Sequence, residues 1–130
     1  MGLIYVDACV VIYAFEDHPQ HGPQARAAFK RASAGQLALS PLVKLECLVA
    51  PMKTGNLVLQ RYYEQGLAQF TVLPLPEQVF LNAAALRAKF NLKTSDALHL
   101  AAAQHHGCEA LWTNDDRLAQ ASHGLAVNVL

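Results

Sequence analysis

The segment LIYVD, residues 3–7, is a run of four apolar residues that ends in a carboxylate. A short apolar run containing β-branched and aromatic residues predicts a buried β-strand. Four more short apolar runs follow, at 37–39, 70–73, 110–113 and 126–129. A stretch with helical spacing of apolar residues follows each of the first four runs. Strands that alternate with helices predict a largely parallel sheet, covered by helices on both faces.

The helical stretches have apolar residues at spacings of three and four. We expect helices around 25–32, 40–50, 59–67, 79–90 and 95–103. Gly35 is expected to end the first of these helices, and PMKTGN, residues 51–56, is the clearest loop. The pattern predicts one domain over residues 1–130, a three-layer α/β/α sandwich around a central, mainly parallel sheet.

Length and composition fit a single folded domain outside the membrane. The 130 residues are 53% hydrophobic and 15% charged, which is too apolar for a disordered chain. No apolar run reaches the roughly 18 residues of a membrane span. The N-terminal segment contains Asp7 and has no basic leader, so it does not resemble a signal peptide. We therefore expect a soluble cytoplasmic protein.

Four acids occupy positions from which they could converge on one edge of the sheet. Asp7 follows the first strand, and Asp115 follows the strand at 110–113 after one intervening residue. Glu46 lies on an otherwise apolar helix, and Asp96 lies near the start of another. Ligands of open parallel sheets bind beyond the carboxyl ends of the strands. Each acid alone is also compatible with a helix cap or a solvated turn, but the set of four favours a site.

The segment KTSDALHLAAA, residues 93–103, shows what such a site requires. Thr94 or Ser95 is the expected N-cap, which puts Asp96 in the first turn of a buried helix. A buried carboxylate is costly unless it is paired, and neighbouring carboxylates repel unless a cation lies among them. Oxygen ligands of this kind suit Mg²⁺ or Mn²⁺.

The ordered motifs YVDACVVIY, SPLVKLE, TSDALHLAAA and WTNDDRL resemble the PIN domain. They are most similar to the short ribonucleases of bacterial and archaeal VapBC toxin–antitoxin modules, and the resemblance covers nearly the whole chain. It implies a metal-dependent endoribonuclease that hydrolyses RNA phosphodiester bonds, the toxin of a toxin–antitoxin pair. It also implies that Asp7, Glu46, Asp96 and Asp115 are catalytic and hold Mg²⁺ or Mn²⁺.

Further expectations follow from the same resemblance. Thr113 should support the first aspartate by hydrogen bonding, and the chain should form a homodimer. A VapB-like antitoxin should bind it, with a basic side chain, expected to be Arg, in the acidic groove. Many members of the family carry Ser, Thr or Asn just after the first aspartate, whereas this chain has Ala8 and Cys9 there.

The charge distribution also bears on an RNA substrate. Ten basic and ten acidic residues give a net charge of zero. Without the four candidate site acids, ten basic residues face six acidic ones, so the remaining surface is mildly basic. Lys93 and Arg117 are the best candidates for phosphate contacts, because each lies within three residues of a proposed ligand.

Two other classes of protein with clustered acids fit this sequence less well. A haloacid-dehalogenase-type phosphatase needs a second aspartate two residues after the first, where this chain has Cys9. A response-regulator receiver expects a phosphoacceptor aspartate at the end of a mid-chain strand, but FTVL is followed by PLPEQ, which has no Asp. A PIN-like domain that only binds RNA or protein remains an alternative. His99 is expected to be a buried, hydrogen-bonded histidine rather than a general base.

Overall fold

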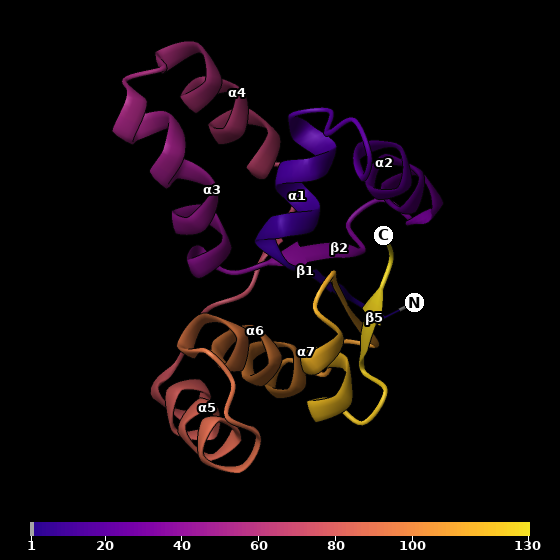
Figure 1. The fold of residues 1–130 in the computed structure, drawn as a ribbon, viewed down its shortest axis with the longest axis vertical. Coiled ribbons are helices and arrows are strands. Elements are labelled where there is room, and N and C mark those ends of the chain that lie inside the picture. The colour runs from indigo at the N-terminus through magenta and orange to yellow at the C-terminus, as the bar shows by residue number, and fades with distance from the viewer. Residues whose placement is uncertain (1) are drawn as a thin grey trace.

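The structure describes residues 2–130. A parallel sheet of five strands forms the centre of this part of the chain (Figure 1). In spatial order the strands are β3 (Thr71–Val72), β2 (Leu37–Leu39), β1 (Ile4–Val6), β4 (Ala110–Thr113) and β5 (Ala126–Asn128). In this computed structural model every neighbouring pair is parallel. Parallel strands all point their carboxyl ends to the same edge, so residues that follow different strands meet there.

Seven helices, counted over the same residues, cover the two faces of the sheet. They are α1 (Ala8–Phe15), α2 (Gly22–Arg31), α3 (Pro41–Thr54), α4 (Leu57–Leu67), α5 (Glu77–Phe90), α6 (Thr94–His105) and α7 (Asp116–Ala121). Figure 1 shows α1 to α4 on one side of the sheet and α5 to α7 on the other. The predicted three-layer α/β/α sandwich with a parallel sheet is therefore confirmed. No helix among the described residues is long and apolar enough to cross a bilayer.

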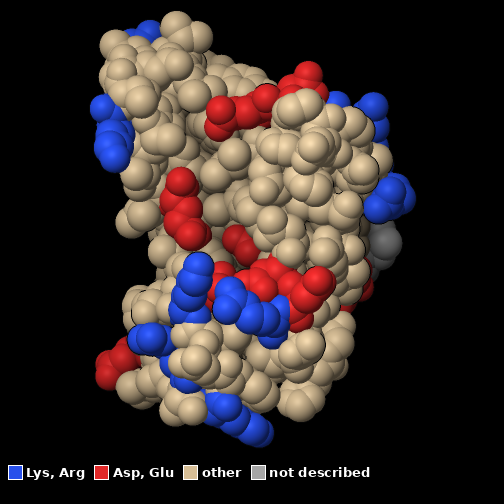
Figure 2. Space-filling model, in the orientation of Figure 1, with Lys and Arg blue, Asp and Glu red and all other residues tan. Residues whose placement is uncertain are grey.

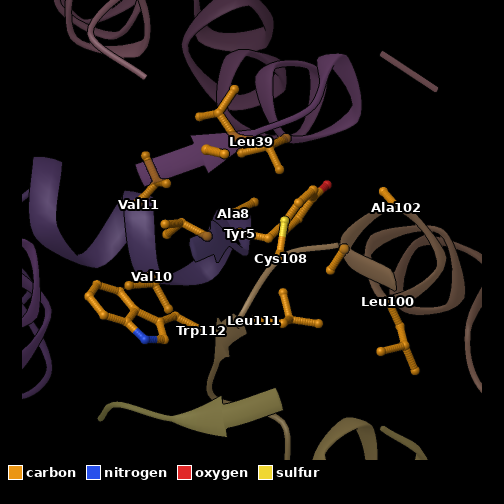
Figure 3. Packing of buried hydrophobic residues seen from close by; sticks show 14 of the residues in the cluster. Tyr5, Ala8, Val10, Val11, Leu39, Leu100, Ala102, Cys108, Leu111 and Trp112 are labelled. Atoms are coloured by element: carbon orange, nitrogen blue, oxygen red, sulfur yellow. The ribbon is translucent and has the colours of Figure 1, made fainter. Parts of the chain in front are cut away.

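The core covers both faces of the sheet, and one part of it lies between the central strands and α6. Tyr5 of β1 and Leu111 of β4 are fully buried, and so are Leu100 and Ala102 of α6 (Figure 3). The alanines of α6 have no bulk beyond Cβ, which lets the helix lie close against both strands. Burial of each larger side chain contributes roughly 1.5–3 kcal/mol. This tight packing of α6 against β1 and β4 holds the residues at the carboxyl ends of the two strands in place.

Some local features differ from the sequence prediction. Helix α1 begins directly after Asp7, although the apolar run after that residue gave no clear helical stripe. Helix α2 ends at Arg31, and Gly35, with φ of 77°, lies in the turn before β2 instead of ending the helix. The predicted loop 51–56 is mostly helical, because α3 continues through the buried Pro51 to Thr54. Only Gly55, with φ of 68°, and the residue after it separate α3 from α4.

Candidate active site

The carboxyl edge of the sheet carries a cleft of about 360 Å³ that all four predicted acids line. Asp7 comes from the end of β1 and Asp115 from the turn after β4. Glu46 projects from α3 and Asp96 from the first turn of α6. Figure 2 shows Asp and Glu side chains gathered in a hollow near the middle of this face. The fold thus brings together acids that are up to 108 residues apart in the sequence.

Thr113 connects two of these acids through one buried hydroxyl. Its Oγ1 donates a hydrogen bond of 3.0 Å to Oδ2 of Asp7 and accepts one of 3.2 Å from the backbone N–H of Asp115. Asp115 in turn is the N-cap of α7, where its Oδ1 accepts from the backbone N–H of Arg117 at 2.9 Å. Asp7 is only 8% exposed, so its carboxylate depends on such donors.

Asp96 lies in the first turn of α6, as predicted, but the predicted N-cap is wrong. Lys93 holds the N-cap position without a side-chain cap, and Thr94 is already helical. The pKa of the Asp96 carboxyl is raised above its usual range, first by burial and then by the charges of Asp7 and Asp115. His99 and Lys93 oppose this shift. Burial and the neighbouring carboxylates therefore disfavour the ionised form of Asp96 relative to an exposed carboxyl, and positive charge in the cleft would favour it.

His99 joins the acid cluster, a role that the sequence analysis did not assign. Its Nε2 lies 2.6 Å from Oε1 of Glu46 and 3.8 Å from Oδ1 of Asp7. Its Nδ1 lies 2.7 Å from the Tyr5 hydroxyl, which is itself 2.7 Å from Oγ of Ser40. Since an ionised carboxylate can only accept, Nε2 of His99 carries the proton that it shares with Glu46. The expected buried and satisfied histidine is therefore also part of the candidate site.

A signal for His99 was present in the sequence. Asp96 and His99 are three residues apart, and such residues are neighbours on a helix surface. Burial lowers the pKa of His99, but the hydrogen bond to Glu46 and the charges of the surrounding carboxylates outweigh this effect, so its pKa is raised. A protonated His99 would partly offset the negative charge of the cluster.

A family model for the PIN domain matches residues 4–124. This chain belongs to the PIN domain family. Its structure is similar to a toxin–antitoxin complex from Klebsiella pneumoniae, with 22% identity and a TM-score of 0.82 over 98% of each chain. It also resembles FitAcB from Neisseria gonorrhoeae, with 21% identity and a TM-score of 0.76 over 98% of each chain.

DNA-bound VapBC from Salmonella typhimurium is a third similar structure, with 17% identity and a TM-score of 0.71 over 98% of each chain. The likeness of the PIN domain to VapC-like toxins, predicted from its motifs, thus extends to the fold of the whole chain. Among curated proteins, no sequence matches this chain.

The donor atoms of the cleft fit a hard divalent cation. The four acids offer only carboxylate oxygens, and those of Asp7 and Glu46 approach within 4.8 Å of each other. The like charges of these acids repel, and together with burial they raise the pKa of Asp96. Mg²⁺ and Mn²⁺ prefer such oxygen ligands and remove this repulsion.

Basic side chains flank the acids of the PIN domain. Lys93 lines the acidic cleft and also an adjoining cleft of about 380 Å³, which Arg117 lines as well. The Arg117 side chain is 71% exposed, with Nε 3.6 Å from Oδ1 of Asp115. Figure 2 shows Lys and Arg side chains directly beside the acidic hollow. Lys93 and Arg117 could therefore bind the negative charges of a ligand at the rim of the cleft.

Cys9 lies where many PIN domains carry a polar residue. Its Sγ is 3.2 Å from Oδ1 of Asn114, to which it donates a hydrogen bond, so the thiol is tied to the loop after β4. Burial, and then the charge of Asp7, raise the pKa of Cys9 to about 12. The thiol is therefore neutral near pH 7 and unsuited to act as a nucleophile.

Proposed function

We propose that this PIN domain is a metal-dependent endoribonuclease that hydrolyses RNA phosphodiester bonds. The PIN domain family consists of nucleases, which supports a hydrolase in general. The observation that carries the finer proposal is the single cleft lined by Asp7, Glu46, Asp96 and Asp115. Four carboxylates from four segments of the chain repel one another when ionised, and a cation among them would relieve this repulsion.

The proposed roles follow from the positions of these side chains. Asp7, Glu46, Asp96 and Asp115 would hold Mg²⁺ or Mn²⁺ as anionic oxygen ligands. When bound, such an ion supplies positive charge that activates water for attack on phosphorus and stabilises the charge of the phosphate. Thr113 keeps the Asp7 carboxylate in place through its 3.0 Å hydrogen bond. A covalent nucleophile is not needed for this chemistry.

The basic rim supplies contacts for the RNA backbone. Lys93 lines the acidic cleft and Arg117 lines the adjoining one, so both are placed to contact phosphates of a bound RNA. Such contacts position a nucleic acid without reading its sequence. Their contribution should weaken as the salt concentration rises.

A toxin–antitoxin role is the biological setting that we propose. The similar structures from Klebsiella pneumoniae and Salmonella typhimurium are a toxin–antitoxin complex and a DNA-bound VapBC. By analogy, a VapB-like antitoxin would inhibit this chain in the cytoplasm by placing an Arg among the carboxylates. A guanidinium can pair with carboxylates in two parallel hydrogen bonds and would compete with the metal ion for the same oxygens.

The direct test is cleavage of a mixed RNA pool by the purified protein. We expect cleavage with Mg²⁺ or Mn²⁺, none with excess EDTA, and recovery when the metal is restored. Protein with Asp7→Asn, purified in the same way, controls for contaminating ribonucleases. Metal-independent cleavage, or equal cleavage by that variant, would contradict the proposal, and no cleavage with either metal would point to a PIN-like domain that only binds RNA or protein.

A further inference from the structure

Three buried polar side chains form a hydrogen-bonded chain beneath the acidic cleft. Ser40 at the start of α3 and Tyr5 in β1 are completely buried, and His99 of α6 is 1% exposed. The Tyr5 hydroxyl lies 2.7 Å from Oγ of Ser40 and 2.7 Å from Nδ1 of His99. The chain ends at Glu46, whose Oε1 is 2.6 Å from Nε2 of His99.

Packing alone does not explain these polar groups. A phenyl ring at position 5 would fill the same space without a hydroxyl that has to be satisfied, and a buried polar group costs free energy unless it is paired. In this chain each group is satisfied by the next one. The ring of His99 is therefore fixed at both nitrogens, and its Nε2–H points at Glu46.

Glu46 depends on this contact for its orientation. Its side chain is 30% exposed, and within residues 2–130 its carboxylate has no other hydrogen bond or ion pair. Nε2 of His99 is also 3.8 Å from Oδ1 of Asp7. One imidazole ring thus sets the spacing between a carboxylate of α3 and a carboxylate at the end of β1.

We propose that His99 and Tyr5 are positioning residues that hold Glu46 toward Asp7 and thereby set the affinity of the cleft for a divalent cation. Tyr5 acts through His99, and neither residue needs to touch the RNA. The inference rests on the proposed metal-dependent function, because it assumes that Glu46 is a ligand. Loss of a partner that orients a metal ligand typically lowers metal affinity or activity by about 10–100-fold.

The decisive variant is Tyr5→Phe, which removes one hydroxyl and keeps the ring. Tyr63→Phe is a matched control, since Tyr63 is also completely buried and donates its hydroxyl hydrogen bond to Glu16, a residue that does not line the acidic cleft. Binding of Mn²⁺ to each protein is measured by calorimetry, and the thermal midpoint is measured without metal. We expect both variants to lose thermal stability, but only Tyr5→Phe to raise the Kd for Mn²⁺, by about 10-fold.

A second pair of variants tests His99 itself. His99→Gln keeps an N–H donor that can reach toward Glu46, whereas His99→Leu removes it. We expect Mn²⁺ affinity to fall further in His99→Leu than in His99→Gln, and cleavage by either variant to recover partly when Mn²⁺ is raised. Recovery at high Mn²⁺ would not follow from a loss of folding alone.

The outcomes separate this inference from the function on which it rests. If the wild-type protein binds Mn²⁺ and Tyr5→Phe binds it equally well, the positioning role is wrong and the proposed function stands. If the wild-type protein binds neither Mg²⁺ nor Mn²⁺, both proposals fail. If Tyr63→Phe weakens Mn²⁺ binding as much as Tyr5→Phe, the effect reflects general destabilisation and the positioning role is again wrong.

Discussion

The hydroxyl of Thr113 donates to Oδ2 of Asp7 at 3.0 Å, across 106 residues of sequence. The Thr113 hydroxyl oxygen also accepts a hydrogen bond of 3.2 Å from the backbone N–H of Asp115. β1 and β4 are neighbours in the sheet, with Val6 paired to Trp112, so the residues after each strand end side by side. A single buried side chain therefore holds the first acid of the site and orients the loop that carries the last one.

Thr113→Val tests this connection, because valine has nearly the same shape and lacks the hydroxyl. Asp7 and the N–H of Asp115 would both lose a partner, and leaving a buried polar group unsatisfied costs about 1–3 kcal/mol. We expect a lower free energy of unfolding and weaker cleavage of RNA. Chemical denaturation and an RNA-cleavage assay measure the two effects.

Thr71→Val is the matched control for that variant. The Thr71 hydroxyl donates to the carbonyl oxygen of Gly35 on the exposed surface, away from the cleft. Surface substitutions of this kind usually change stability by less than about 0.5 kcal/mol. If Thr113→Val were as active and as stable as the wild type and as Thr71→Val, the contact between Thr113 and Asp7 would be dispensable.

The sequence was informative about the site wherever an acid followed a strand. Asp7 and Asp115 are adjacent or nearly adjacent to apolar strand segments, and in a parallel sheet this placement alone puts them at one edge. Glu46 stood out because a carboxylate interrupts an apolar helix. These inferences need only the strand order to be roughly right, since every carboxyl end lies at the same edge.

The contribution of His99 could not be read from the sequence in the same way. Its partners, Tyr5 and Glu46, lie on other elements, and their distances depend on how α3 and α6 pack. Local helix signals also failed at Pro51, where burial of the ring within α3 outweighs the backbone N–H that proline lacks. Tertiary packing decides both features, and one sequence does not contain it explicitly.

A homodimer remains a prediction, and the structure offers a surface for it. Helices α3 and α4 expose a set of large apolar side chains, Leu45, Val49, Met52, Leu57 and Val58. A specific interface buries at least ~1,000 Å² in total. We expect light scattering at micromolar concentration to give twice the 14.1 kDa of one chain. Val58→Glu, at a site that is 82% exposed, should shift the protein toward monomer.

Leu81→Glu is the control for the dimer. Leu81 is 56% exposed on α5, which lies on the other side of the sheet. This substitution should leave the mass measured by light scattering at that of the dimer. A monomeric wild-type protein, or equal dissociation by the two variants, would count against an interface on α3 and α4.

Inhibition by an antitoxin can be tested by co-expression with the short protein encoded immediately upstream, where such a gene exists. We expect the two proteins to co-purify and the complex to cleave no RNA. Replacement of the inhibiting Arg of the partner by Ala should restore cleavage without abolishing the complex, because the bidentate contact with the carboxylates would be lost. If the partner blocks cleavage equally well without any Arg, inhibition does not work through the acidic cleft.

Asp96→Asn separates a metal ligand from an ordinary first-turn acid. If Asp96 only interacted with the helix dipole, its neutralisation would lower the free energy of unfolding by roughly 0.3–1 kcal/mol. As a ligand, Asp96 instead supplies an anionic oxygen, so its loss should weaken Mn²⁺ binding and lower RNA cleavage by orders of magnitude. Without metal the variant should be more stable than the wild type, because one of several repelling carboxylates has gone.

The raised pKa of Asp96 fixes how this gain in stability depends on pH. The folded protein holds the Asp96 proton more tightly than the unfolded chain, so the wild type loses stability as pH rises through the folded pKa of this group. The advantage of Asp96→Asn without metal should therefore be present near pH 7 and disappear in acid, where the wild-type carboxyl is protonated. Thermal midpoints at both pH values, with and without Mn²⁺, measure this pH dependence.

At 100 times its Kd, Mn²⁺ should stabilise the wild type by about 2.7 kcal/mol and Asp96→Asn by much less. A variant that cleaves RNA like the wild type and shows the full Mn²⁺ shift would rule out Asp96 as a ligand.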